Sequence, residues 1–281
     1  MKIINILFGL ALIFLFIAGK EHKKFKPSSS GIARGQMPAL AKDKSGKFHL
    51  VYGSGDSLMY TYSMDQGTSF VKPSLLGILP HLVAGHTRGP QIAASDHLIT
   101  VIACNKSGDI FSYQKQPSGG WETAALVNDA DTVAKEGLMA LAADGNITYA
   151  VWLDVRDNHN KLFGSLSVDG GKTWSRNILI YASPDTTVCN CCKPSVGVQG
   201  NHVFVMFHYW LGGNRDLYLI ESWDAGKSFG REQKLGNGSW ALNACPMDGG
   251  GIAIDKKGNL TTVWRREDKY FPVSLEIRRR S

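Results

Sequence analysis

The chain has 281 residues (30.7 kDa), of which 43% are hydrophobic and 20% charged, which excludes a disordered, collagen-like or disulfide-dense small protein and allows a large core. The 31 Lys and Arg exceed the 24 Asp and Glu and give a net charge of +7. Part of this excess lies near the two termini, so we expect no nucleic-acid partner. The 31 glycines and seven tryptophans favour many short strands joined by tight turns.

The N-terminus reads as a targeting segment. Lys2 precedes a nearly unbroken apolar run that ends at Gly19, a length typical of a signal peptide rather than of a membrane span. We predict a signal peptide over 1–20, with an uncleaved N-terminal anchor as the alternative, and a polar linker over 21–30. Both alternatives predict an exported protein (secreted, periplasmic or anchored) that meets the membrane only through this segment.

A repeated pattern governs the rest of the chain. The segments 63–70, 167–174 and 222–229 share the sequence S-x-D-x-G-x-[ST]-[FW], and their aspartates (Asp65, Asp169 and Asp224) are 104 and 55 residues apart. Predicted strands keep the same step near fifty, at 48–52, 98–103, 147–152, 203–207 and 260–264. Each repeat reads as strand, turn, strand, loop, strand, Asp-containing turn, strand. The pattern predicts one domain over 31–281, built from four-stranded antiparallel sheets that must stack on neighbours.

The Asp-containing turns have a structural logic. We expect the carboxylates of Asp65, Asp169 and Asp224 to accept backbone N–H groups within each turn. The glycines two positions later supply a backbone conformation with positive φ, namely Gly67, Gly171 and Gly226. These residues are therefore predicted to be folding devices rather than catalytic groups.

This pattern resembles the Asp-box (BNR) repeat of sialidase-like β-propellers, over nearly all of residues 31–281. The resemblance implies an all-β, sialidase-type β-propeller, which in that family usually closes six blades. Four complete repeats and the opening strands of a fifth precede Ser281, so we expect four to five blades and a chain that is either shorter than its relatives or truncated at the C-terminus.

The family contains hydrolases and non-catalytic binding proteins, so two functions stay open. The first is a sialidase-like glycoside hydrolase that acts on glycans with an anionic sugar and needs no cofactor. The second is a non-catalytic propeller that binds a glycan, a protein or a soft metal. Both functions predict a carbohydrate or glycoconjugate partner. In the second function, the glycan, protein or soft metal would bind at the face that bears the cysteines described below.

Loop parity indicates where a site would lie. Strands in a blade run antiparallel, so the Asp turns lie at one end, and the loops after the second and fourth strands lie at the other. Propellers of this type bind ligands at that second end. The loops there bring together charged side chains that suit an anionic or carbohydrate ligand, among them Arg88, Arg156, Arg215, His208, Asp248 and Arg265.

Sialidases hold the substrate carboxylate with three arginines and use an aspartate as acid/base and a tyrosine–glutamate pair as nucleophile. The first arginine belongs to an R-x-P signature, which Arg88 to Pro90 matches. The resemblance makes Arg88, Arg156 and Arg215 candidate clamps. Asp109 and Asp56 are the candidate acid/base residues, because the family's aspartate follows the signature by some twenty residues. The late blades that supply the third arginine and the tyrosine in that family are absent or truncated here.

Four of the five cysteines fall in two consecutive loops at this same end: Cys189, Cys191, Cys192 and Cys245. In an oxidising compartment we expect one or two disulfides that join these loops, with Cys245 paired to one of the other three. Adjacent Cys191 and Cys192 are not expected to pair, because that geometry is strained. The alternative is a Cu or Zn site formed by the four thiols, with Met247 and His208 nearby. Cys104 is predicted to be buried.

Overall fold

The computed structural model describes residues 31–95, 98–116, 119–184, 187–267 and 269–275, and its strands belong to one unit, Ile32–Ser281. The predicted signal peptide or anchor (1–20) and the linker (21–30) lie outside the described residues. Strands and turns, without a helix, make up the described part of the chain. Within it there is accordingly no helix long and apolar enough to cross a membrane.

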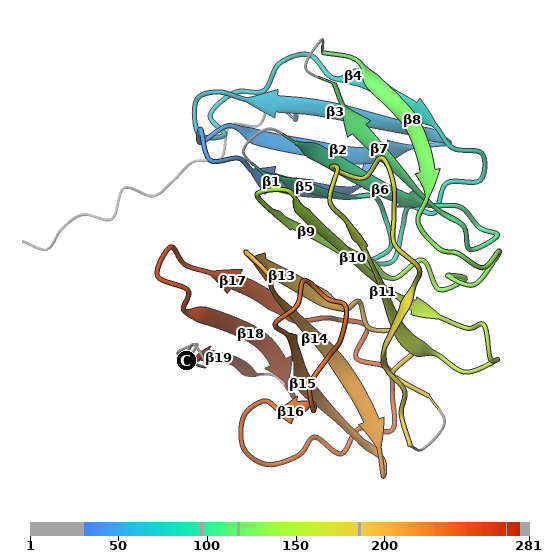
Figure 1. The fold of residues 1–281 in the computed structure, drawn as a ribbon, viewed down its shortest axis with the longest axis vertical. Coiled ribbons are helices and arrows are strands. Elements are labelled where there is room, and N and C mark those ends of the chain that lie inside the picture. The colour runs from blue at the N-terminus through green and yellow to red at the C-terminus, as the bar shows by residue number, and fades with distance from the viewer. Residues whose placement is uncertain (1–30, 96–97, 117–118, 185–186, 268, 276–281) are drawn as a thin grey trace, which may run out of the picture. The chain divides into compact units, whose positions relative to one another are not determined.

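The strands form five antiparallel sheets within the described residues, and each sheet is a run of consecutive strands (Figure 1). The all-β prediction is confirmed, and the number of sheets agrees with the four to five expected. The first sheet holds β1 (Gln36–Lys42), β2 (Phe48–Ser54), β3 (Ser57–Ser63) and β4 (Ser74–Ile78). The second holds β5 (Gln91–Ala94), β6 (Ile99–Cys104), β7 (Ile110–Lys115) and β8 (Trp121–Leu126). The third holds β9 (Met139–Asp144), β10 (Ile147–Asp154), β11 (Lys161–Ser167) and β12 (Ile178–Tyr181). The fourth holds β13 (Ser195–Gln199), β14 (His202–Leu211), β15 (Asn214–Ser222) and β16 (Gln233–Lys234), and the fifth holds β17 (Gly251–Ile254), β18 (Leu260–Arg266) and β19 (Lys269–Leu275).

The core lies between neighbouring sheets, because each inner sheet is apolar on both faces. In β6, Val101 belongs to a cluster shared with the first sheet, and the next residue, Ile102, belongs to a cluster shared with the third. Successive side chains of a strand point to opposite faces, so a strand between two sheets needs apolar residues at consecutive positions. The same reason explains the buried, apolar run of β14, whose Phe204 and Val205 face different sheets.

The first strand of each sheet sets the order of stacking. β1 lies beside β5, β5 beside β9, β9 beside β13 and β13 beside β17. In Figure 1 the sheets accordingly follow one another in chain order, from blue through green and orange to red. The loops that follow the second and fourth strands of successive sheets are therefore brought together at one end.

The three Asp turns share one set of hydrogen bonds. In the first turn, Ser63 Oγ donates to Asp65 Oδ1 at 2.7 Å and accepts the N–H of Gly67 at 2.8 Å, and Asp65 Oδ1 accepts the N–H of Ser69 at 2.9 Å. The turns at Asp169 and Asp224 repeat these contacts with distances of 2.7 to 3.0 Å. Each turn lies between the third and fourth strands of its sheet, as the sequence predicts.

Two of these turns also fasten one sheet to the preceding sheet. Tyr149 of the third sheet donates its hydroxyl to Gly226 O at 2.9 Å, and Thr100 of the second sheet donates to Gly170 O at 2.8 Å. A Cβ atom on Gly226 would lie 2.0 Å from the Tyr149 ring. Gly67, in the first turn, has open space at the same position.

Candidate functional site

Arg88 and Arg156, two of the predicted clamps, lie in different ion pairs. Arg88 Nη2 donates to Glu136 Oε2 at 3.2 Å, and its Nε donates to the carbonyl of Glu136. Arg156 donates to both carboxylate oxygens of buried Asp154, at 2.9 and 2.8 Å, and forms an ion pair with Asp129 at 3.2 Å. Arg156 thus holds a buried charge within the third sheet.

Asp56 and Asp109, the predicted acid/base residues, bind backbone groups. Asp56 Oδ1 accepts the N–H of His81 at 3.0 Å, and Asp109 Oδ1 accepts the N–H of Thr132 at 2.8 Å. Asp216 does the same for Trp240 at 2.9 Å. In each of these three sheets, an aspartate near the start of the third strand accepts a hydrogen bond from the loop after the fourth strand. This contact holds the loop in place, so the role of these aspartates in the structure is to stabilise the fold.

The five residues predicted by resemblance therefore do not meet at one place through any described contact. Among the described residues, no hydrogen bond or ion pair brings two of the three arginines to a common partner. The sialidase assignments of Arg88, Arg156, Arg215, Asp109 and Asp56 stay predictions. Arg215 lies elsewhere, beside the cysteines.

The cysteines of two consecutive loops meet between the third, fourth and fifth sheets. Cys191 and Cys245 form a disulfide, in agreement with the expectation that Cys245 pairs with one of the other three. Cys189 Sγ lies 3.4 Å from Cys191 Sγ and 3.4 Å from Cys192 Sγ. We call these four residues the cysteine junction. Cys189, Cys192 and Cys104 are free thiols. Cys104 lies apart from the junction, buried in the second sheet, and burial raises the pKa of its thiol to about 12.

Arg215 is the cation of the cysteine junction. Its Nη1 donates to Cys189 Sγ at 2.9 Å, and its guanidinium stacks on the Trp210 ring at 4.2 Å. The hydrogen bond between the Cys189 and Cys192 sulfurs, with further help from the charges of His208 and Arg215, holds the pKa of Cys189 below its ordinary value. The same sulfur contact and burial raise the pKa of Cys192. Of this pair, Cys189 is therefore the thiol that ionises first.

Asp248 connects the cysteine junction with the fifth sheet. Its Oδ1 accepts a hydrogen bond from Nε2 of buried His208 at 3.2 Å, and its Oδ2 accepts one from Arg265 Nε at 2.6 Å. Burial opposes ionisation, but these two hydrogen bonds outweigh it and hold the pKa of Asp248 below its ordinary value. Loop parity placed His208, Asp248 and Arg265 at this end of the sheets. It did not single them out, because nothing in their spacing shows that they touch.

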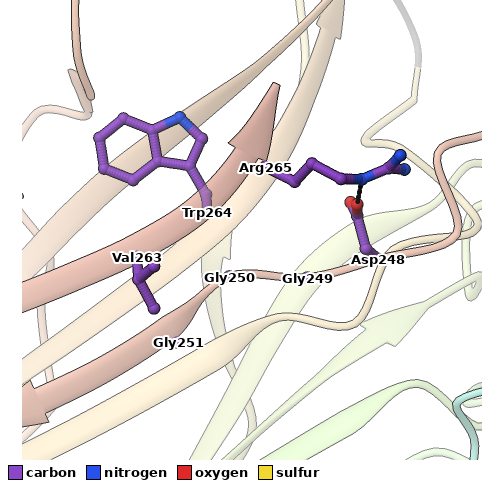
Figure 2. A pocket seen from close by; sticks show the side chains of 7 residues that line it. All are labelled: Asp248, Gly249, Gly250, Gly251, Val263, Trp264 and Arg265. Atoms are coloured by element: carbon purple, nitrogen blue, oxygen red, sulfur yellow. Dashed lines mark hydrogen bonds and ion pairs between the residues drawn. The ribbon is translucent and has the colours of Figure 1, made fainter. Parts of the chain in front are cut away.

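A cavity of about 520 Å³ opens beside this carboxylate. Its lining is formed by residues 248–251 and 263–265, and Figure 2 shows the side chains of Asp248 and Arg265 pointing toward each other along it. Gly249 and Gly250 allow close packing here, since a Cβ atom would lie 2.2 Å from Lys193 O and 2.0 Å from Met206 Cε, respectively. The cavity thus has a charged donor, a charged acceptor and accessible backbone.

Two overlapping groups at the cysteine junction could hold a soft metal ion. Their ligand atoms lie within 4.8 Å of one another, and they are Cys189, Cys191 and Cys192, and Cys192, His208 and Asp248. Since Cys191 is bonded to Cys245, the thiols available without reduction are Cys189 and Cys192. The Cu or Zn site stays a prediction.

No family model and no curated protein matches the sequence. Solved structures do match. The α-L-arabinanase of Penicillium chrysogenum superposes with a TM-score of 0.58 at 15% identity, over 85% of this chain and 78% of the other. The Aleuria aurantia lectin, described as a six-bladed β-propeller that recognises fucose, superposes with a TM-score of 0.55 at 12% identity, over 84% and 74%. An α-L-arabinofuranosidase of Fusarium graminearum gives 0.50 at 14% identity, over 81% and 74%.

The chain has the β-propeller fold. At these identities the likeness concerns the fold alone, and it agrees with the stacked sheets and the series of first strands described above.

Proposed function

We propose that this chain is an exported propeller that binds a carbohydrate in the cavity beside Asp248 and Arg265. The observation that carries the proposal is the cavity itself, at the loop-bearing end of the fold. Its volume, about 520 Å³, falls in the range of small-molecule sites. A carboxylate and a guanidinium on its wall offer the acceptor and the donors that sugar hydroxyl groups need.

The solved structures with this fold add support of a different kind. The two with the highest TM-scores named above are an arabinanase complexed with arabinobiose and a fucose-recognising lectin. Both bind carbohydrates. Export follows from the predicted signal peptide or anchor over 1–20, and an exported propeller would meet glycans outside the cytoplasm.

Binding suits the geometry better than hydrolysis does. Most glycosidases need two carboxyl groups, and sialidases need three arginines with a tyrosine nucleophile. The described lining of the cavity supplies one carboxylate, Asp248. Arg88 and Arg156 are engaged in separate ion pairs. Sialoside hydrolysis therefore stays a prediction of the sequence resemblance, tested by turnover of a fluorogenic sialoside and its loss, by at least a hundredfold, in Arg88→Ala.

Calorimetric titration of the purified protein with a panel of neutral and acidic oligosaccharides tests the proposal. Arg265→Gln and Asp248→Asn should weaken the binding of the best ligand by at least about tenfold, equivalent to about 1.4 kcal/mol. Arg88→Gln is the matched control. Its Arg88–Glu136 pair is exposed to 23% and 29%, much like the 33% and 26% of Arg265 and Asp248.

Three outcomes would contradict the proposal. A folded wild type that binds no oligosaccharide of the panel at millimolar concentration excludes it. Binding that Arg88→Gln abolishes and Arg265→Gln leaves intact moves the site to the residues predicted by the sialidase resemblance. Rapid turnover of a sialoside by the wild type would make the chain a hydrolase.

A further inference from the structure

The cysteine junction contains both redox states of sulfur in contact. One pair, Cys191 and Cys245, is a disulfide, and Cys189 and Cys192 are thiols. Cys189 Sγ lies 3.4 Å from Cys191 Sγ, which is van der Waals contact between a thiol and one sulfur of the disulfide. Cys189 also lies 3.4 Å from Cys192 Sγ. One sulfur atom is therefore in reach of both an electrophile and a second thiol.

The four sulfur atoms differ in exposure. Cys189 and Cys192 are 1% and 3% exposed, whereas Cys191 is half-buried and Cys245 is exposed. A pair of electrons that passes from the thiols to the disulfide would move from the interior to the surface.

A buried cation selects the reactive sulfur. Arg215 is 6% exposed, and its guanidinium cannot lose its proton in a protein. A buried charge is expensive unless it is paired, and no ion pair between described residues includes Arg215. The group that Arg215 Nη1 contacts is Cys189 Sγ, at 2.9 Å. A thiolate at Cys189 would supply the missing negative charge.

The sequence spacing fits the same chemistry. Cys189 and Cys192 form a C-x-x-C pair, the spacing that favours an ionised first thiol and a protonated second thiol. His208 lies beside Cys192, with a nitrogen within 4.8 Å of its Sγ. Its Nε2 donates to Asp248, and its buried Nδ1 has no hydrogen-bond partner among the described residues. The junction therefore borders a buried polar nitrogen that no described residue satisfies.

We propose that Cys189 and Cys192 form a buried dithiol that exchanges with the surface disulfide Cys191–Cys245. In the first step the Cys189 thiolate attacks Cys191 Sγ, so that a Cys189–Cys191 bond forms and the Cys191–Cys245 bond breaks. Cys245 leaves as a thiolate and takes a proton from solvent. In the second step Cys192 attacks Cys189 Sγ, which forms Cys189–Cys192 and releases Cys191, and the proton of Cys192 passes to the departing Cys191.

The balance needs no external reagent. Two buried thiols become a disulfide, one surface disulfide becomes two thiols, and two electrons move outward. The exposed product, Cys245 with Cys191, is the form that would meet a disulfide of another molecule. The inference does not depend on carbohydrate binding, because the exchange uses only residues of the cysteine junction.

Alkylation of Cys245 tests the exchange. The folded wild type, prepared without reductant and freed of metal with a chelator, is incubated with N-ethylmaleimide, and peptides are mapped by mass spectrometry without reduction. Cys245 carries the label only if it has left its disulfide. Since alkylation is irreversible, even a minor exchanged population accumulates label over time. We expect Cys245 to become labelled in the wild type.

Variants identify the attacking sulfur. Cys189→Ser should slow the labelling of Cys245 at least about tenfold, because no thiol then lies against Cys191 Sγ. Cys104→Ser is the matched control, since Cys104 is also a buried free thiol but lies in the second sheet, and its rate should equal that of the wild type. Thermal unfolding establishes that each variant is folded.

Two results would overturn the proposal. One is a folded wild type in which Cys245 stays unlabelled after the buried thiols have reacted, a result that needs no variant. The other is equal labelling in the wild type and in folded Cys189→Ser.

Discussion

The Asp turns and the cysteine junction differ in how often their contacts recur. The hydrogen bonds of Asp65 are repeated at Asp169 and Asp224, in three sheets. The contact between Arg215 and Cys189 and the disulfide Cys191–Cys245 each occur once in the described residues. A contact that recurs in several sheets serves the fold that the sheets share, whereas a contact that occurs once cannot be explained by the repeat.

The same comparison separates residues within the loop-bearing end. Asp56, Asp109 and Asp216 lie there too, yet all three bind a backbone N–H of the following loop. Asp248 differs from these three aspartates, because its carboxylate accepts hydrogen bonds from the side chains of His208 and Arg265. Recurrence, rather than position in the fold, therefore distinguishes Asp248 from the predicted acid/base residues.

The largest expected effect concerns the turn glycines. Gly226 and Gly67 both have positive φ, of 83° and 87°, so alanine at either site should lose about 1–2 kcal/mol of stability from backbone strain. At Gly226 a Cβ atom would also collide with Tyr149, which should add about 1–3 kcal/mol. Urea unfolding of Gly226→Ala and Gly67→Ala measures the difference. Equal losses would show that the turns do not fasten the sheets to one another.

A smaller effect should follow from the removal of single inter-sheet hydrogen bonds. Tyr149→Phe removes the bond to Gly226 O, and Thr100→Val removes the bond to Gly170 O. Each should lower the free energy of unfolding by about 1 kcal/mol. Because the two bonds lie at different interfaces, the losses should add in the double variant. Stabilities indistinguishable from the wild type in both variants would contradict this role.

The Asp turns should also make the fold sensitive to acid. Hydrogen bonds from Ser228 and Ser222 lower the pKa of Asp224 to about 2. The unfolded value is near 3.9, so this contribution to stability is present above about pH 4 and is lost as the pH falls towards 2. Asp224→Asn should flatten the stability curve in that window. An unchanged slope between pH 4 and pH 2 would show that the carboxylate has the same pKa in both states.

Much of the fold could be predicted because it repeats. The step near fifty residues, the alternation of strands and the glycine after each turn aspartate all follow from rules that act locally. The site could not be predicted to the same degree. Arg88 and Arg215 are both arginines in loops at one end, and sequence spacing does not show that one contacts Glu136 and the other Cys189. The pairing of Cys245 with Cys191, rather than with its neighbours, likewise depends on how two sheets pack.

The central claim is that the contacts of Cys189 with Arg215 and with Cys191, which occur once in the described residues, make Cys189 a nucleophile toward the neighbouring disulfide. The pH dependence of Cys245 labelling tests this claim most directly. The lowered pKa of Cys189 means that its thiolate forms at lower pH than that of an ordinary thiol. With N-ethylmaleimide in excess, so that the release of Cys245 and not its alkylation limits labelling, the rate in the folded wild type should therefore rise with pH and reach half its maximum below about pH 8.5, the ordinary thiol pKa. In Arg215→Gln the midpoint should move upward, because the cation beside the sulfur is gone. A midpoint at or above about pH 8.5 in the wild type, or one that Arg215→Gln leaves unchanged, would contradict the account.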